Sequence, residues 1–352
     1  MFWAMSIAKG KELIMIKISE ISKITGYSTS TVSRVLNNKG NFKDETVQKI
    51  REVVNSLNYK PNTVQEKLMN NNFSIAMFIP QRDAFIGNNP AYSSDIPDLR
   101  EELEACGNMV ILATNSEKSE RSSMSFRMIE EKKIDGAVVC GAFVDDEIVE
   151  KLIAYNIPYI VTNGIDFSKN WNCVDYNNYS ASENVIDYLY DLGHRKIGIL
   201  SGPEKHLISI NRLDGCKSSF AKHNLTLSDD LILSGAFSYD NGYNSAKELL
   251  KNHKDITAIF AFDDIIACGA MKAIQELGYS IPDDISIIGF DDIELAKFTV
   301  PALTTVKRFK YDMYKLVAEL VNNLILNKYI ERINITFKTE MVIRDSCKDI
   351  NK

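Results

Sequence analysis

The segment spanning residues 17–68 constrains the fold of this chain more than any other segment does. Its pattern predicts a short helix over residues 19–24 and a tight turn at Gly26, because glycine reaches backbone conformations that other residues avoid. Ser28 then stands where a side-chain oxygen would cap the first free amides of a second helix. Residues 44–58 have apolar side chains at helical spacing, which predicts a third helix that packs on the other two.

The predicted second helix has one apolar face and one polar face. Its apolar residues are three and four positions apart and so share the buried face: Val32, Val35 and Leu36. Short polar groups and one long cation face the other way: Thr29, Ser30, Ser33 and Arg34. Two helices joined by a tight turn, the second with a small polar outer face, are typical of the helix-turn-helix motif, whose second helix enters the major groove of DNA.

The charge of the chain is unevenly distributed along its length. Residues 15–72 hold nine Lys or Arg and five Asp or Glu, although the 352 residues together have a net charge of −6. A basic N-terminal segment on an acidic body predicts that contact with nucleic acid is confined to one end. The length allows two or three domains with a large core.

From Phe73 onward, short apolar runs rich in β-branched residues alternate with amphipathic stretches. The apolar runs predict strands over residues 75–80, 109–115, 136–141, 158–163, 196–202, 258–262 and 285–292. The intervening stretches predict helices, among them residues 91–106, 117–132, 178–192, 239–252, 264–278 and 310–327. Such alternation predicts parallel sheets covered by helices on both faces. Because the series breaks near residue 175, we expect an α/β fold with two doubly wound lobes and a cleft between them.

Polar residues stand at the carboxyl ends of several predicted strands, where open α/β sheets bind their ligands. They are Asn89, Tyr92, Asn115, Asn163, Asp263, Asp264, Asp291 and Asp292. Each carboxylate accepts two or more hydrogen bonds, so a cluster of carboxylates and amides suits several hydroxyl groups at once. The set therefore favours a sugar over a nucleotide as ligand.

The run TGYSTSTVSRVLNNKG, followed by LNYKPN, resembles the LacI/GalR family of bacterial transcription regulators. The resemblance implies that the second helix reads the major groove and that the segment after Asn62 forms a hinge helix in the minor groove. The implied DNA-contacting residues are Ser28, Thr29, Ser30, Thr31, Ser33, Arg34, Asn37, Asn62, Gln65 and Leu68. Leu68 takes the place of the leucine that wedges between the central base steps, and such apolar insertion kinks DNA. Gln65 departs from the family, which usually has a small alanine there.

The resemblance also implies domain boundaries. A helix-turn-helix domain over residues 15–60 and a hinge over residues 61–72 precede an effector-binding and dimerisation domain over residues 73–352. This large domain is similar to periplasmic sugar-binding proteins, with one lobe over about 73–174 and 306–337 and a second over about 175–305 and 338–347. Relatives usually start just before the first helix, so we expect translation to begin at Met15. A genuine N-terminal extension over residues 1–14 is the alternative.

Further parts of the resemblance concern the effector site. The segment SINRLDG resembles the family segment whose arginine, here Arg212, holds sugar hydroxyls, and GAFSYDNGY places Phe237 to stack on a sugar face. The implied effector-binding residues are Asn89, Tyr92, Asn163, Arg212, Phe237, Asp263, Asp291 and Arg308. Arg308 departs from the family, which commonly has glutamine there. It either favours an anionic effector or forms a salt bridge with Asp263 or Asp291.

Together these features predict a homodimeric, ligand-responsive transcription regulator in the cytoplasm. We expect a repressor of carbohydrate genes that binds a near-palindromic double-stranded DNA operator. An α/β enzyme that processes sugars or phosphate esters, with an added DNA-binding head, is one alternative, and a regulator that responds to a nucleobase is another. The chain contains no GxGxxG, GxxxxGK[ST], GxSxG or HExxH motif, so we expect no catalytic activity.

The cysteine and histidine patterns predict neither a metal site nor disulfides. The six cysteines are far apart, with no CxxC pair, and the four histidines lack ligand spacing. We therefore expect reduced cysteines and no cofactor. No apolar run reaches the roughly 18 residues that a membrane span needs, and the N-terminus lacks the order of a signal peptide.

Overall fold

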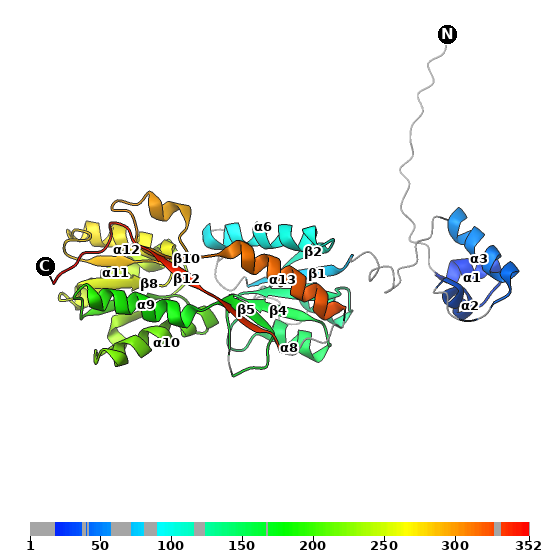
Figure 1. The fold of residues 1–352 in the computed structure, drawn as a ribbon, viewed down its shortest axis with the longest axis horizontal. Coiled ribbons are helices and arrows are strands. Elements are labelled where there is room, and N and C mark those ends of the chain that lie inside the picture. Colours follow the sequence, from blue (N-terminus) through cyan, green and yellow to red (C-terminus); the bar gives the residue numbers. More distant parts are fainter. Residues whose placement is uncertain are drawn as a thin grey trace, which may run out of the picture. The chain divides into compact units, whose positions relative to one another are not determined.

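The computed structural model describes residues 18–36, 40, 42–57, 72–80, 90–115, 124–166, 168–326 and 332–351. The chain divides into two compact units, Met1–Asn72 and Phe73–Lys352 (Figure 1). Each unit has a hydrophobic core of its own. The described part of the first unit is helical, whereas the second unit alternates strands with helices.

The described part of the first unit contains three helices: α1 (Ile18–Thr25), α2 (Thr29–Leu36) and α3 (Asp44–Ser56). All three contribute buried residues to one core: Ile21, Val32, Val35, Ile50 and Val54. Gly26 has a φ of +77°, so the turn between α1 and α2 requires glycine. The Ser28 hydroxyl accepts a hydrogen bond from the Thr31 amide at 3.2 Å and caps α2. These features confirm the predicted helix-turn-helix.

The first lobe of the larger unit contains a six-stranded parallel sheet with the strand order β11-β5-β4-β3-β1-β2. Its strands are β1 (Ser74–Pro80), β2 (Met109–Asn115), β3 (Gly136–Cys140), β4 (Tyr159–Thr162), β5 (Cys173–Tyr176) and β11 (Asn334–Phe337). Its helices are α6 (Pro90–Ala105), α7 (Met124–Glu130), α8 (Glu147–Ala154) and α13 (Lys310–Ile325). Figure 1 shows α6 and α13 on one face of this sheet and α8 on the other.

Alternate residues of β1 serve the two faces of this sheet, as the period of two in a strand requires. Ile75 and Met77 belong to the core beneath α6 and α13. Ala76 and Phe78 belong to the core that α7 and α8 cover. A strand that is apolar at every position therefore lies at the centre of a sheet with two covered faces.

The second lobe has a four-stranded parallel sheet with the order β7-β6-β8-β9. Its strands are β6 (Ile197–Ser201), β7 (Ile232–Ser234), β8 (Ala258–Ala261) and β9 (Ser286–Ile288). Its helices are α9 (Asn178–Asp191), α10 (Leu207–Lys222), α11 (Tyr239–Asn252) and α12 (Asp264–Glu276), with short 3₁₀ helices η1 (Asp229–Leu231) and η2 (Glu294–Lys297). Two further strands, β10 (Thr305–Arg308) and β12 (Thr339–Val342), pair antiparallel and run between the lobes (Figure 1).

The structure and the predicted elements differ in places. The expected strand over residues 285–292 ends at Ile288, because the next residues pair with residues 304–306 instead of β8: the Gly289 amide donates to the Thr304 carbonyl and the Asp291 amide to the Val306 carbonyl. β5 continues to Tyr176, so the sheet of the first lobe extends past the expected boundary at residue 174. Of the stretch predicted as a helix over residues 117–132, residues 124–132 are described, and the helix there ends at Glu130. These differences leave the two-lobed α/β architecture as predicted, and the fold class is confirmed.

Several predicted segments lie outside the described residues. They are residues 1–17, which include the proposed start, and the hinge up to residue 71. All six cysteines are described, and all six are free thiols. Burial raises the pKa of Cys140 and of Cys268 to about 12, as for cysteines that serve as core residues.

Candidate functional site

The side of α2 that faces away from the core is polar. Some of its hydroxyl groups form hydrogen bonds with each other at the start of the helix. Thr29, Ser30 and Arg34 are exposed. The Ser28 hydroxyl lies 2.8 Å from the Ser30 hydroxyl and 2.9 Å from the Thr31 hydroxyl, so the capping residue is hydrogen-bonded to two side chains of the first turn of the helix. The exposed side of α2 therefore presents short hydroxyls and one guanidinium, which are groups that contact base edges and phosphates.

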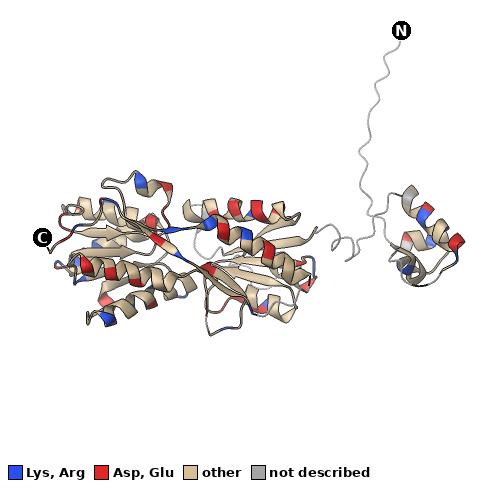
Figure 2. Cartoon of the chain, viewed as in Figure 1, with Lys and Arg blue, Asp and Glu red and all other residues tan. Residues whose placement is uncertain are grey.

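Other predicted DNA contacts cannot be placed in the same way. The side chain of Ser33 lies outside the described part of α2. Outside the described residues altogether are Asn37, Asn62, Gln65 and Leu68. Figure 2 colours Lys and Arg positions on the ribbons of the helices of the first unit, and a row of Asp and Glu positions along α6 of the larger unit.

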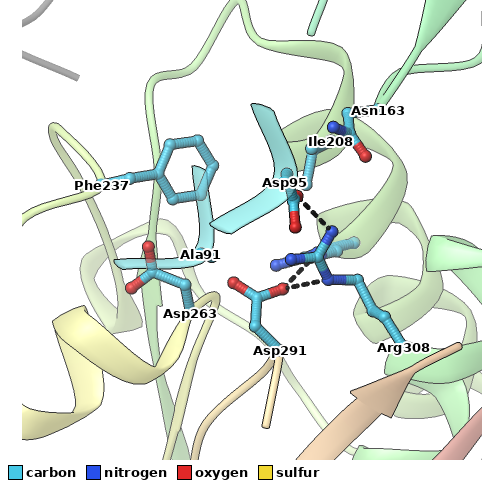
Figure 3. Close-up of a pocket in the computed structure, with 9 residues that line it drawn as sticks. Ala91, Asp95, Asn163, Ile208, Phe237, Asp263, Asp291 and Arg308 are labelled. Carbon is cyan, nitrogen blue, oxygen red and sulfur yellow. Dashed lines mark hydrogen bonds and ion pairs between the residues drawn. The ribbon is translucent and has the colours of Figure 1, made fainter. Parts of the chain in front are cut away.

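A cavity lies between the two lobes of the larger unit (Figure 3). The first lobe contributes Ala91, Asp95 and Asn163 to its lining. The second lobe contributes Ile208, Arg212, Phe237, Asp263 and Asp291. Arg308, at the end of β10, completes the lining from the segment that connects the lobes.

Six of the eight predicted effector-binding residues line this one cavity: Asn163, Arg212, Phe237, Asp263, Asp291 and Arg308. Asn89 and the side chain of Tyr92 lie outside the described part of the chain. Asp264, also at a strand end, is buried behind the cavity, where its carboxylate accepts hydrogen bonds from the Thr305 hydroxyl at 2.5 Å and the Ile293 amide at 2.9 Å. Strand-end position therefore found three of the lining residues, Asn163, Asp263 and Asp291, and the family resemblance found Arg212, Phe237 and Arg308.

Sequence reasoning missed Ala91, Asp95 and Ile208. Asp95 lies on α6 and not at a strand end, so the rule that found the other carboxylates does not reach it. A signal was present, because Asp95 is three residues after the predicted site residue Tyr92, and residues at this spacing share one side of a helix.

Arg212 is held in place by four groups. Its Nε donates to the Asn178 side-chain oxygen at 2.9 Å, and its Nη1 donates to the Phe262 carbonyl. The guanidinium lies 3.4 Å from the centroid of the Phe290 ring, and its Nη2 lies 3.8 Å from the Asp291 carboxylate. A guanidinium fixed in this way and lining the cavity is a preorganised hydrogen-bond donor for a ligand.

Asn178 connects Arg212 to a second buried carboxylate. Its side-chain nitrogen donates to the Asp175 carboxylate at 3.0 Å. Burial raises the pKa of Asp175 to about 6, although the Tyr176 amide and the Arg212 charge oppose the shift. This network runs from β5 in the first lobe to α10 in the second.

Arg308 forms ion pairs with carboxylates of both lobes. Its Nε lies 2.8 Å from Asp291 of the second lobe, and its Nη1 lies 3.0 Å from Asp95 of the first. Lys310 also reaches Asp95, at 2.7 Å. Burial alone would raise the pKa of Asp95, but Arg308 and Lys310 outweigh it and hold the pKa below its usual value. Of the two alternatives for Arg308, a salt bridge to Asp291 is therefore the one observed, and Asp95 is a further partner.

The remaining lining residues are fixed by local structure. The Asp263 carboxylate accepts a hydrogen bond from the Ile266 amide at 2.7 Å and caps α12. The Phe237 ring is buried and packs edge-on against His206, at 5.5 Å between centroids. A Cβ at Gly202 would lie 2.2 Å from this ring, so only glycine leaves room for it.

The chemistry of the cavity is that of a binding site for a small polar ligand. Carboxylates, guanidiniums and one amide supply acceptors and donors, and Phe237 supplies one apolar face. Within the described residues, no group of three His, Cys, Asp or Glu side chains is arranged to hold a metal ion. No helix in the described part of the chain is long and apolar enough to cross a membrane.

The head and the cavity together define a class of protein, the DNA-binding regulators in which a helix-turn-helix precedes a two-lobed domain with a ligand cavity. Two family models match the chain: "Bacterial regulatory proteins, lacI family" over residues 17–62 and "Periplasmic binding protein-like domain" over residues 186–347. The chain belongs to the lacI family of bacterial regulatory proteins, as its sequence motifs predicted.

Relatives of known name resemble the chain along its whole length. The HTH-type transcriptional repressor PurR of Vibrio cholerae serotype O1 (strain M66-2) is 32% identical over 341 residues, which cover 96% of this chain and 100% of that protein. The repressor of the same name from Histophilus somni (strain 129Pt) is 30% identical, with the same coverage. The structure of the transcriptional regulator CelR in complex with cellobiose has a TM-score of 0.72 at 22% identity, over 94% of this chain and 99% of that chain.

This membership makes the chain a DNA-binding transcriptional repressor. Both PurR relatives are transcriptional repressors, which agrees with the prediction of a regulator over that of an enzyme.

Proposed function

We propose that the chain is a homodimeric repressor whose affinity for its operator is set by a small hydroxyl-rich effector, of the sugar class, bound in the cavity between the lobes. One observation carries the proposal: Arg212, Asp263 and Asp291 converge on the cavity between the lobes, beside the Phe237 ring. Carboxylates accept hydrogen bonds from hydroxyl groups, and a guanidinium donates to hydroxyl and ring oxygens. An aromatic face packs against the apolar C–H surface of such a ligand.

The position of the cavity links effector binding to DNA binding. Its lining comes from both lobes and from the segment that connects them, so a ligand with different contacts in the open and closed arrangements shifts the balance between them. In a dimer this shift changes the separation of the two hinges and their heads. Two heads would read half-sites of a near-palindromic operator about 34 Å apart. Since a repressor acts where its operator is, we place it in the cytoplasm.

A nucleobase is the second candidate effector. The flat Phe237 ring favours it, because a base stacks on such a face, and so does the whole-length likeness to the repressors named PurR. The two candidates differ in their demands. A sugar needs many hydrogen bonds from its hydroxyls to the carboxylates, whereas a base needs a planar slot and a few in-plane hydrogen bonds.

The test is a ligand screen with the full chain. Thermal unfolding is followed with neutral sugars, sugar phosphates, uronates, nucleobases and nucleosides, and hits are measured by calorimetry. Each hit is then added to a titration of an operator selected from randomised DNA. Arg212→Ala should abolish binding of the hit, while Arg195→Ala, a change at an exposed arginine of the second lobe, should leave it unchanged.

The outcomes separate the candidates. A nucleobase hit that needs Arg212 would replace the sugar with the second candidate. A hit that is indifferent to Arg212→Ala would move the effector site away from this cavity. Metal-dependent turnover of a glycoside or phosphate ester that Asp291→Ala abolishes would revive the enzyme alternative.

A further inference from the structure

Asp95 occupies the position in the cavity where a ligand would meet the cations of the connecting segment. It lies on α6 of the first lobe and is only 6% exposed. One carboxylate oxygen lies 3.0 Å from Arg308 Nη1, and the other lies 2.7 Å from Lys310 Nζ. Figure 3 shows Asp95 and Asp291 on two sides of the Arg308 guanidinium, both joined to it.

Each cation of the site lies beside at least one carboxylate. Arg308 and Lys310 contact Asp95, and Arg308 and Arg212 contact Asp291. The buried Asp175 also lies near Arg212. Asp291 contacts both guanidiniums, at 2.8 Å from Arg308 and 3.8 Å from Arg212. Asp95 is thus the partner that Arg308 and Lys310 share, and the chain itself provides the anion that these two cations attract.

We infer that Asp95 is a specificity-determining residue: its carboxylate takes the place that an anionic group of a ligand would take on Arg308 and Lys310, so the cavity admits uncharged hydroxyl-rich ligands and excludes anions. This inference rests on the proposed function, in that the cavity binds a small effector. On this inference, the Asp95 carboxylate determines whether the cavity binds a neutral sugar or the phosphate or uronate form of that sugar.

The physical reason is competition for buried donors. A phosphate or carboxylate entering the cavity must either displace Asp95 from Arg308 or lie beside it, and two like charges a few ångströms apart repel strongly in a partly buried site. An uncharged hydroxyl needs neither, because the outer lone pairs of a paired carboxylate still accept hydrogen bonds. Removing the charge of Asp95 while keeping its shape therefore creates an anion site from cations that are already in place.

The experiment measures the binding of inorganic phosphate to the full chain by calorimetry, in buffer free of other polyvalent anions. The variants are Asp95→Asn, which removes the charge, Asp95→Glu, which keeps it, and Asp98→Asn, an exposed position on the same helix, as matched control. Asp95→Asn should bind phosphate at least about tenfold more tightly than the parent, since one charge at this distance is worth more than a tenfold change. Asp95→Glu and Asp98→Asn should behave as the parent does.

Two further variants localise the effect and guard against a folding defect. Asp95→Asn combined with Arg308→Gln should lose the gain, because it removes the cation that phosphate would meet. Asp95→Ser removes the charge by a second route and should also gain phosphate affinity. Circular dichroism establishes that each variant is folded.

Three results would overturn the inference. They are tight phosphate binding by the parent, no gain in either neutral variant of Asp95, and a gain that survives the loss of Arg308. The proposed function is tested by a different result: it is wrong if no sugar binds to the parent protein. If Asp95→Asn gains phosphate binding while the parent binds no sugar, the charge of Asp95 still decides anion entry, and only the effector class is wrong.

Discussion

Replacing Arg308 by glutamine should destabilise the larger unit by about 3 kcal/mol, the lower end of the cost of breaking a buried ion pair by removing one partner. Its side chain is 5% exposed, and those of its partners Asp95 and Asp291 are 7% and 8% exposed. Lys310 remains beside Asp95, and Arg212 beside Asp291, which is why the lower end applies. Glutamine also keeps one donor toward Asp291.

The assay is urea unfolding of the full chain, followed by circular dichroism and by the fluorescence of buried Trp171 in the first lobe. A Trp3→Phe background removes the other tryptophan. Arg100→Gln is the matched control, because Arg100 forms an ion pair with Glu104 in which both side chains are about half exposed (53% and 46%). This control should cost less than about 1 kcal/mol. Equal losses for Arg308→Gln and Arg100→Gln would refute the view that Arg308 stabilises the arrangement of the two lobes.

Three further predictions concern other parts of the molecule. Arg34→Ala should weaken operator binding about tenfold or more while changing its salt dependence by less than one phosphate contact, as anisotropy titrations at several salt concentrations would show; an unchanged affinity would contradict a base contact. The folded-state pKa of Asp175, about 6, lies above its unfolded value of 3.8, so its contribution to stability is complete below pH 3.8 and is lost as the pH rises through about 6. Asp175→Asn should therefore reduce the change in unfolding free energy between about pH 4 and about pH 7 by about 3 kcal/mol. An unaltered pH profile would contradict the raised pKa of Asp175. Gly242→Ala should lower the unfolding free energy by about 1–3 kcal/mol, because the added Cβ would lie 2.0 Å from the Ile266 carbonyl oxygen where α11 packs on α12, and normal stability in urea would show that the helices separate freely.

The parts of the fold that sequence predicted well depend on local signals. Gly26 and the Ser28 cap define the turn of the head within a few residues of chain. Apolar runs identify the central strands because both faces of their sheets are covered. The end of the strand after Ser286 was placed too late, since nothing in the run ISIIGFDD signals that Gly289 and Asp291 hydrogen-bond to residues 304–306 instead of β8.

The candidate site was predictable where it depends on topology and unpredictable where it depends on distant partners. Strand ends brought Asn163, Asp263 and Asp291 to the cavity. The partner of Arg308 could not be chosen from sequence, because Asp95 is 213 residues away along the chain. Whether this ion pair forms depends on how the segment that connects the lobes runs past α6. No local sequence pattern encodes that path.

Control of DNA binding by the cavity is tested most directly by titrating the selected operator with the full chain, with and without the effector found by screening. We expect the effector to change the operator affinity of the parent, whereas Arg212→Ala and Asp291→Ala still bind the operator but no longer respond to the effector. A normal response in both variants would contradict the claim that the cavity between the lobes controls binding to DNA.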